Sequence, residues 1–254
     1  MRRCDRVGVN GRPRLIMNVI PLLAVVAAIS TVGLSSPRLH AAEEDGVALA
    51  IIYDTSGSMK DPVRDQSGGS SAKYLIANRA LLAVTKQIGA FATNNPGGAP
   101  RKIDTGLFVF QGQGAREAVK LGPFDPVALE SWAMHFSNPS GNTPLGNALA
   151  TASRAVLDSP LSRKHVLVIT DGINTSGPTP EAVLPRIKKQ AEQKHTTLSV
   201  HFVAFDVNAK VFDPVKKLGA TVVSAADEQQ LNAQLGYILQ RKILLEEEEP
   251  AKTK

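Results

Sequence analysis

Three oxygen-bearing side chains follow an apolar segment near the start of the chain, at a spacing that suits a cation site. Residues 47–53 form a run of apolar or small residues, and Asp54, Ser56 and Ser58 come directly after it. A run that is apolar at every position is typical of a strand buried on both faces, as in parallel sheets. Ligands of open α/β sheets bind outside the carboxyl ends of such strands. We therefore predict a metal site here, although Asp, Ser and Gly are also ordinary residues of turns.

Two more oxygen donors lie far along the chain in segments of a similar kind. Thr143 belongs to a loop rich in Pro, Gly and Asn (residues 139–146), and Asp171 follows the largely apolar run 164–170. Each also has an ordinary structural explanation. A threonine followed by proline is typical of a helix N-cap, and an aspartate followed by glycine is typical of a turn. The metal hypothesis requires all five residues to meet at one edge of one sheet.

The elements that must position these residues alternate between strands and helices from residue 47 to residue 245. We expect strands at 47–53, 103–110, 117–121, 164–170, 198–205 and 221–224, and helices at 72–93, 126–136, from the 139–146 loop to about 157, and at 178–194, 210–218 and 227–245. Residues 60–71 hold a proline and a Ser-Gly run, which predicts a flexible loop. The alternation predicts one α/β domain with a doubly wound, mostly parallel central sheet, helices on both faces and one antiparallel edge strand at 117–121.

With these elements in place, the sequence resembles a von Willebrand factor A-type (vWA) domain of bacterial type with an intact metal-ion-dependent adhesion site (MIDAS). The resemblance depends on three motifs, Asp54-Thr55-Ser56-Gly57-Ser58, Gly141-Asn142-Thr143-Pro144-Leu145 and Ile169-Thr170-Asp171-Gly172. Each motif alone is weakly specific, whereas three in the family's order on matching elements are specific. The resemblance covers essentially all of a domain that we place at residues 46–245. It implies a Rossmann-like vWA fold and a metal site formed by Asp54, Ser56, Ser58, Thr143 and Asp171.

The ligands of this predicted site are hydroxyl and carboxylate oxygens, without His or Cys. Such a set suits a hard divalent cation, Mg²⁺ or alternatively Mn²⁺ or Ca²⁺. Because Mg²⁺ keeps several waters, few direct protein ligands are needed. The resemblance implies that Ser56 and Ser58 bind the ion directly, Thr143 directly or through water, and the two aspartates mostly through water. It also implies one open coordination position, which an acidic side chain of a protein partner can fill.

The first 42 residues have the composition of an export signal. They carry six arginines and one aspartate, and an apolar run ends at Leu34 before small residues. This pattern is typical of a secretory signal peptide, and an uncleaved membrane anchor of about 20 residues is the alternative. We therefore expect an exported protein, periplasmic or secreted, that contacts the membrane only through this segment if it is retained. The single cysteine, Cys4, lies ahead of the apolar run, and we assign it no role.

The rest of the chain is almost neutral. Residues 43–254 hold 23 basic and 22 acidic side chains, a balance of +1, so most of the net charge of +6 comes from the leader. This balance gives no reason to expect nucleic-acid binding. Residues 246–254 are highly charged and predict a disordered tail.

Other classes of function share parts of this pattern. A phosphatase of the haloacid-dehalogenase type needs a second aspartate two residues after the first, and Ser56 stands there, so the general acid is missing. A Ser-His-Asp hydrolase would need Ser58 with His165, His195 or His201, but the sequence has no Gly-x-Ser-x-Gly elbow. We therefore expect no enzymatic activity. The main alternative to a metal-dependent adhesion module is a metal-independent scaffold subunit of an envelope complex, which nothing in the fold class excludes.

Overall fold

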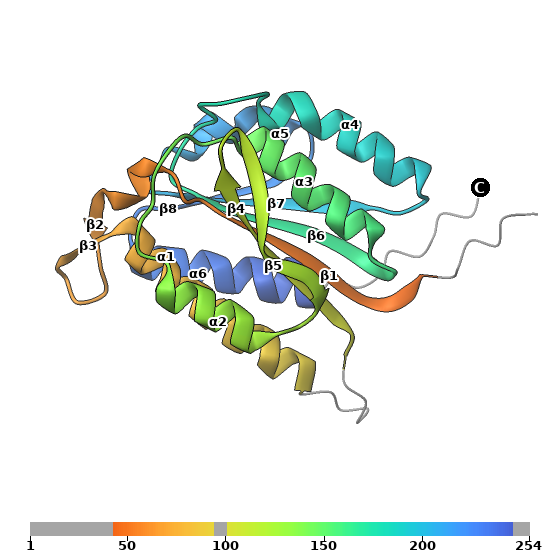
Figure 1. The fold of residues 1–254 in the computed structure, drawn as a ribbon, viewed down its shortest axis with the longest axis horizontal. Helices are drawn as coiled ribbons and strands as arrows, with labels where there is room; N and C mark the ends of the chain where they lie inside the picture. Colours follow the sequence, from red (N-terminus) through yellow and green to blue (C-terminus); the bar gives the residue numbers. More distant parts are fainter. Residues whose placement is uncertain (1–42, 94–100, 246–254) are drawn as a thin grey trace, which may run out of the picture. The chain divides into compact units, whose positions relative to one another are not determined.

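The computed structural model describes residues 43–93 and 101–245, arranged around a mostly parallel sheet (Figure 1). The strands of the main sheet are β1 (Glu44–Tyr53), β4 (Ile103–Gln111), β5 (Gly114–Pro123), β6 (Leu161–Thr170), β7 (Leu198–Phe205) and β8 (Thr221–Ala225), and β2 (Pro62–Arg64) pairs with β3 (Ser70–Ala72). The main sheet has the order β5-β4-β1-β6-β7-β8. All neighbouring strands are parallel except β4 and β5. The predicted fold class, with its single antiparallel edge strand, is confirmed.

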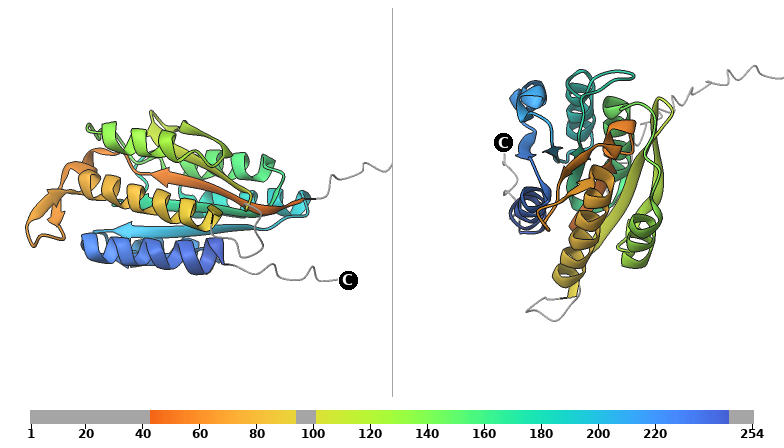
Figure 2. Two further views of the ribbon diagram at one scale, coloured as in Figure 1. Left: turned by 90° about the horizontal axis from the view of Figure 1, so that it is seen from below. Right: turned by 90° about the vertical axis from the view of Figure 1, so that its left-hand side faces the viewer.

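Helices cover both faces of this sheet (Figures 1 and 2). They are α1 (Lys73–Thr93), α2 (Pro126–His135), α3 (Leu145–Asp158), α4 (Pro180–Gln193), α5 (Asp213–Lys217) and α6 (Glu228–Ile238), with 3₁₀ turns η1 (Gly57–Lys60) and η2 (Ala209–Phe212) and a π-helix η3 (Leu239–Leu244). The helices α1, α2 and α6 pack on one face, and α3, α4 and α5 pack on the other. None of the helices in the described part of the chain is long and apolar enough to cross a membrane. The predicted leader (1–42) and tail (246–254) lie outside the described residues.

The apolar run at the start of the domain forms a central strand between two cores. Because side chains of a strand alternate between its faces, Leu49 and Ile51 of β1 pack with α1, α2 and α6, whereas Ala50 and Ile52 pack with α3 and α4. All four side chains are fully buried. A strand in this position needs apolar residues at every step, and this explains the absence of polar alternation in the sequence.

The segment 60–71, which we expected to be a flexible loop, contains the β2–β3 hairpin. Asp65 closes its turn, because one carboxylate oxygen accepts hydrogen bonds from the backbone N–H groups of Ser67 and Gly69, both at 3.0 Å. The other oxygen accepts a bond from the Ser71 hydroxyl at 2.8 Å. The glycines and serines that suggested flexibility instead supply the donors and the backbone freedom of a closed turn.

The end of the domain also departs in detail from the expected continuous helix over residues 227–245. The helix α6 changes to the π-helix η3 at Leu239. Buried apolar side chains continue through the change, with Leu239, Ile243 and Leu244 all in the core shared with α1. The apolar pattern of residues 227–245 therefore predicts a helix with a buried face, but it does not predict the wider π-helical turns that begin at Leu239.

Two buried histidines stack on each other on neighbouring strands. The rings of His165 (β6) and His201 (β7) have centroids 5.6 Å apart and planes at 20°. Burial, and then the neighbouring charges, lowers the pKa of His165 to about 3 and that of His201 to about 4. The neighbouring groups are His201 and Arg163 for the first ring, and Lys242 for the second. Both rings are therefore neutral in the folded protein at neutral pH and act as core residues.

This pair predicts a loss of stability in mild acid. In the unfolded chain a histidine titrates near pH 6.5, so below that pH the unfolded state binds protons that the folded state excludes. The free energy of unfolding should fall by up to about 1.4 kcal/mol per pH unit for each histidine between pH 6.5 and about 4. Urea denaturation at pH 7.5, 6 and 5 measures this slope.

The double variant His165→Gln, His201→Gln should have a shallower slope over the same range, whereas His135→Gln, at an exposed position of α2, should behave as the wild type. Equal slopes for the wild type and the double variant would show that the pair does not control acid stability.

Candidate metal centre

The predicted site residues lie at the carboxyl end of the central strands. Asp54, Ser56 and Ser58 follow β1, and Asp171 follows β6. These strands are parallel neighbours, with Tyr53 opposite Ile169 in the register. Parallel pairing therefore brings two distant parts of the sequence to the same edge of the sheet, as the metal hypothesis required.

Hydrogen bonds join four of the five residues. Asp54 accepts a bond from the backbone N–H of Ser56 at 2.8 Å and another from the Thr170 hydroxyl at 2.6 Å. The Ser58 hydroxyl donates to Asp171 Oδ1 at 2.8 Å. The hydroxyl oxygens of Ser56 and Ser58 lie 3.1 Å apart. Two carboxylates and two hydroxyls thus form one connected cluster.

Thr143 joins this cluster from the loop before α3. Its N-cap interpretation is wrong, because Pro144 occupies the N-cap position and makes no side-chain capping bond. Instead, the Thr143 backbone N–H donates to Thr175 Oγ1 at 2.8 Å, and its carbonyl accepts the Thr175 N–H at 3.0 Å. A β-carbon on Gly172 would lie 3.7 Å from Thr143 Oγ1 and 3.9 Å from Ser58 Oγ. The two hydroxyls therefore approach the same point beside Gly172.

The electrostatics of the cluster favour a cation. Asp54 is fully buried and Asp171 is 6% exposed. Burial, and then the negative charge of Asp171, raises the pKa of Asp54 to about 6, although hydrogen bonds from Ser56 and Thr170 partly oppose this. Like charges that share a buried site disfavour ionisation unless a cation compensates them.

The donor set also decides which cations fit. Among the described residues, no group of three or more His, Cys, Asp or Glu side chains is placed to hold a metal ion. A cation at this edge would therefore depend on the hydroxyls of Ser56, Ser58 and Thr143 together with the two aspartates. Such an all-oxygen set fits Mg²⁺, Mn²⁺ or Ca²⁺. Metal binding by these five residues stays a prediction, and the geometry is compatible with it.

Sequence reasoning missed two charged residues in contact with the cluster. Lys73, the first residue of α1, places its Nζ 3.1 Å from Asp171 Oδ2 and 3.0 Å from Asp206 Oδ2. Burial alone would lower the pKa of Lys73, but the bonds to Asp206 and Asp171 outweigh it and raise the pKa. Asp206 follows β7 as Asp54 follows β1 and Asp171 follows β6. That repeated position, an acid directly after an apolar strand, was the signal that could have identified Asp206.

The loop at residues 174–178 contacts the start of α3 and holds it in place. Asn174 Oδ1 accepts the backbone N–H of Gly146 at 3.1 Å. A β-carbon on Gly146 would lie only 2.1 Å from the Pro178 carbonyl oxygen. Glycine is therefore required where this loop crosses α3, one turn from Thr143.

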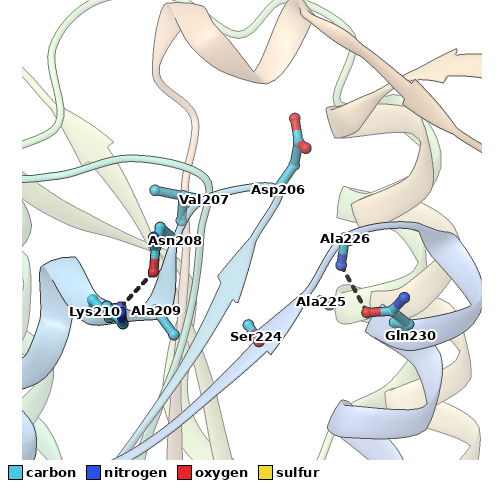
Figure 3. Close-up of a pocket in the computed structure, with 9 residues that line it drawn as sticks. All are labelled: Asp206, Val207, Asn208, Ala209, Lys210, Ser224, Ala225, Ala226 and Gln230. Atoms are coloured by element: carbon cyan, nitrogen blue, oxygen red, sulfur yellow. Dashed lines mark hydrogen bonds between the residues drawn. The ribbon is translucent and has the colours of Figure 1, made fainter.

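An open pocket adjoins the site on the side of Asp206 (Figure 3). It has a volume of about 400 Å³ and lies between the segments that follow β7 and β8, lined by Asp206, Val207, Asn208, Ala209, Lys210, Ser224, Ala225, Ala226 and Gln230. Its polar groups are largely engaged locally, as when Gln230 Oε1 accepts the Ala226 N–H at 3.1 Å. In Figure 3 the Asp206 side chain extends away from Ser224 and Lys210. Asp206 thus belongs to the rim that the pocket and the cluster share.

Comparison with known proteins identifies the fold. A scan against protein-family models and a search of curated proteins found no match. Among solved structures, the chain is similar to the PilB minor pilin from Streptococcus sanguinis (16% identity, TM-score 0.57, covering 78% of this chain and 62% of the pilin). It is also similar to the SpRpn10 VWA domain (16% identity, TM-score 0.54, covering 75% of this chain and 93% of that domain). A third similar structure is proximal thread matrix protein 1 from the mussel byssus, with a zinc-occupied MIDAS motif (14% identity, TM-score 0.52, covering 78% of this chain and 48% of the byssus protein).

These similarities show that the described part of the chain has the Rossmann-like vWA fold. The chain spans about 62% of the pilin and about half of the byssus protein. At these identities the likeness concerns the fold alone, and the zinc site is a property of the byssus protein.

The hydroxyl ligands predict a specific loss of metal binding. Ser58→Ala or Asp54→Ala should weaken Mg²⁺ and Mn²⁺ binding by about 10–100-fold, the range typical when a residue that supports a metal site is lost. The fold should persist, because each change removes only a few hydrogen bonds. Isothermal titration calorimetry measures the affinities, with Ser131→Ala on the exposed side of α2 as the matched control. Wild-type affinity in either site variant would refute the assignment.

The close contact at Gly146 predicts a second effect. Gly146→Ala should lower the free energy of unfolding by about 1–3 kcal/mol, the usual cost of overpacking. It should also weaken metal binding, because the start of α3 would move together with Thr143. Gly114→Ala has open space around it and should change stability by less than about 0.5 kcal/mol. Urea denaturation and calorimetry check both effects. Equal stabilities of the two variants would contradict the proposed packing.

Proposed function

We propose that this protein is an exported, metal-dependent protein-binding module, in which a divalent cation connects the domain to an acidic side chain of a partner protein. The observation that carries this proposal is the meeting of the Ser58 and Thr143 hydroxyls beside Gly172, next to the carboxylate of Asp171. Three hydroxyls and two acids from three separate segments converge there. Such convergence has no role in a simple turn or helix cap.

Each residue has a defined role in this proposal. Ser56 and Ser58 would hold the ion directly, Thr143 directly or through water, and Asp54 and Asp171 mostly through water. When bound, the cation supplies positive charge and one coordination position that a carboxylate can occupy. Thr170 fixes Asp54 by a 2.6 Å hydrogen bond, so that this carboxylate keeps its orientation. These roles amount to binding rather than catalysis, and we propose no enzymatic activity.

The comparisons support parts of this proposal without extending to this chain's own ligands. Zinc occupies the MIDAS motif of the byssus protein, so a divalent ion is compatible with the fold. The all-oxygen set of this chain favours Mg²⁺, with Mn²⁺ or Ca²⁺ as alternatives. PilB is a minor pilin, and this supports, together with the leader-like residues 1–42, a location outside the cytoplasm. Periplasmic and secreted forms are both consistent with this proposal.

One observation favours a second candidate, a metal-independent scaffold. Lys73 already provides a positive charge to Asp171 at 3.1 Å, so part of the charge compensation that a metal would supply is built into the chain. In that case the domain would bind its partners through a surface that needs no ion.

A capture experiment separates the candidates. The immobilised protein should retain a partner from an envelope or secreted fraction in Mg²⁺, lose it in EDTA and regain it when Mg²⁺ is restored. Asp171→Ala should capture none, and Ser131→Ala should capture as the wild type. Capture that is indifferent to EDTA would support the scaffold, and turnover of a phosphoester or peptide by the purified protein would indicate an enzyme.

A further inference from the structure

Lys73 occupies a place that a lysine rarely takes. Its side chain is 7% exposed, although lysine is almost never buried without a partner. It lies at the first position of α1, where the helix dipole disfavours a positive charge. Its backbone N–H donates to the carbonyl of Asp61 at 3.0 Å, which ties it to the segment that follows the Ser56–Ser58 turn. Burial and the helix terminus both oppose the charge, so the two carboxylates that it contacts must account for its position.

Those carboxylates follow two different strands, β6 and β7, and differ in exposure. The Asp171 side chain is fully buried, whereas that of Asp206 is 40% exposed. Asp206 has a left-handed backbone (φ 51°), a conformation that few non-glycine residues adopt. Because the Asp171 side chain is the more buried, the ion pair of Lys73 with Asp171 is the less screened of the two. The same Asp171 carboxylate also accepts the hydrogen bond from the Ser58 hydroxyl.

The net charge of Lys73 and the three aspartates at this edge of the sheet is opposite to that of a divalent cation. Asp54, Asp171 and Asp206 supply three negative charges when ionised, and Lys73 supplies one positive charge. The remaining charge of two matches one divalent cation. Without the lysine, these carboxylates would carry three uncompensated negative charges, and without Asp206 the net charge would be only one negative. Because a buried or partly buried charge is weakly screened, each of these changes should act strongly on an ion held by Ser58 and Thr143.

We propose that Lys73 is an internal cation that competes electrostatically with the divalent ion, and that Asp206 determines how strongly it competes by drawing the ammonium away from Asp171. This inference rests on the proposed function, since it concerns the same site. Lys73 thereby sets the Mg²⁺ concentration at which the module becomes able to bind a partner. Asp206, on the rim of the adjoining pocket, is then a regulatory residue of the site without being a ligand.

The two residues should have opposite effects, which a merely structural ion pair would not produce. Titration of the full chain with Mg²⁺ by calorimetry, and with Mn²⁺ by electron paramagnetic resonance, should show at least about tenfold tighter binding for Lys73→Met, because a nearby repulsive charge is removed. Asp206→Asn should bind several-fold more weakly. Lys73→Arg should remain close to the wild type. Lys86→Met, an exposed lysine of the same helix, is the matched control and should not change.

The outcomes distinguish this inference from the proposed function. If the wild type binds the metal and Lys73→Met binds it equally tightly or more weakly, the inference is overturned while the proposed function stands. No binding by the wild type or by any Lys73 variant overturns both. Circular dichroism checks that each variant is folded, and if Lys73→Met does not fold, Lys73→Gln carries the same test, because it removes the charge and keeps a hydrogen-bonding group.

Discussion

The structure depends on two buried carboxylates placed side by side at the ends of two parallel strands. Asp54 and Asp171 are both removed from water, and their mutual repulsion raises the free energy of the ionised pair. Every polar group around them offsets part of this cost. Ser56 and Thr170 donate to Asp54, and Ser58 and Lys73 donate to Asp171. Such charge-assisted hydrogen bonds are about twice as strong as neutral ones, which allows the fold to keep two acids in its interior.

This arrangement follows from topology more than from local sequence. The parallel pairing of β1 with β6 places the two aspartates at one edge, and the loop before α3 adds Thr143. Thr143 is held by backbone and side-chain bonds to Thr175 and by the close crossing at Gly146. Its loop is also bonded to the segment after β1, where the Ser140 N–H donates to the Thr55 carbonyl at 2.7 Å and the Gly57 N–H donates to the Gly141 carbonyl at 3.1 Å. The position of one potential ligand is thus determined partly by a loop that contributes no ligand itself. The site therefore requires the whole sheet edge to be assembled.

The sequence was sufficient for the strands of the main sheet and for the placement of Asp54, Ser56, Ser58 and Asp171 at one edge of it, because these residues come directly after strands with a recognisable pattern. A strand buried on both faces must be apolar throughout, so 47–53 and 164–170 were recognisable, and the polar residues directly after them had to lie at the sheet edge. Lys73 could not be found in this way. It is 98 residues from Asp171, and its neighbours in the sequence give no sign that it is buried. The Asp65 turn was missed because the same glycines and serines also occur in flexible loops.

The position of Lys73 also relates the metal-dependent and metal-independent candidates to each other. A single ammonium between Asp171 and Asp206 compensates part of the buried charge. Among the described residues, no cation is paired with Asp54, and burial, followed by the negative charge of Asp171, raises the pKa of this carboxyl. In our proposal, a site whose negative charge is only partly compensated in this way is suited to bind a cation reversibly. In the proposed function, the same lysine that offsets part of the buried charge therefore leaves a reason for the ion to bind.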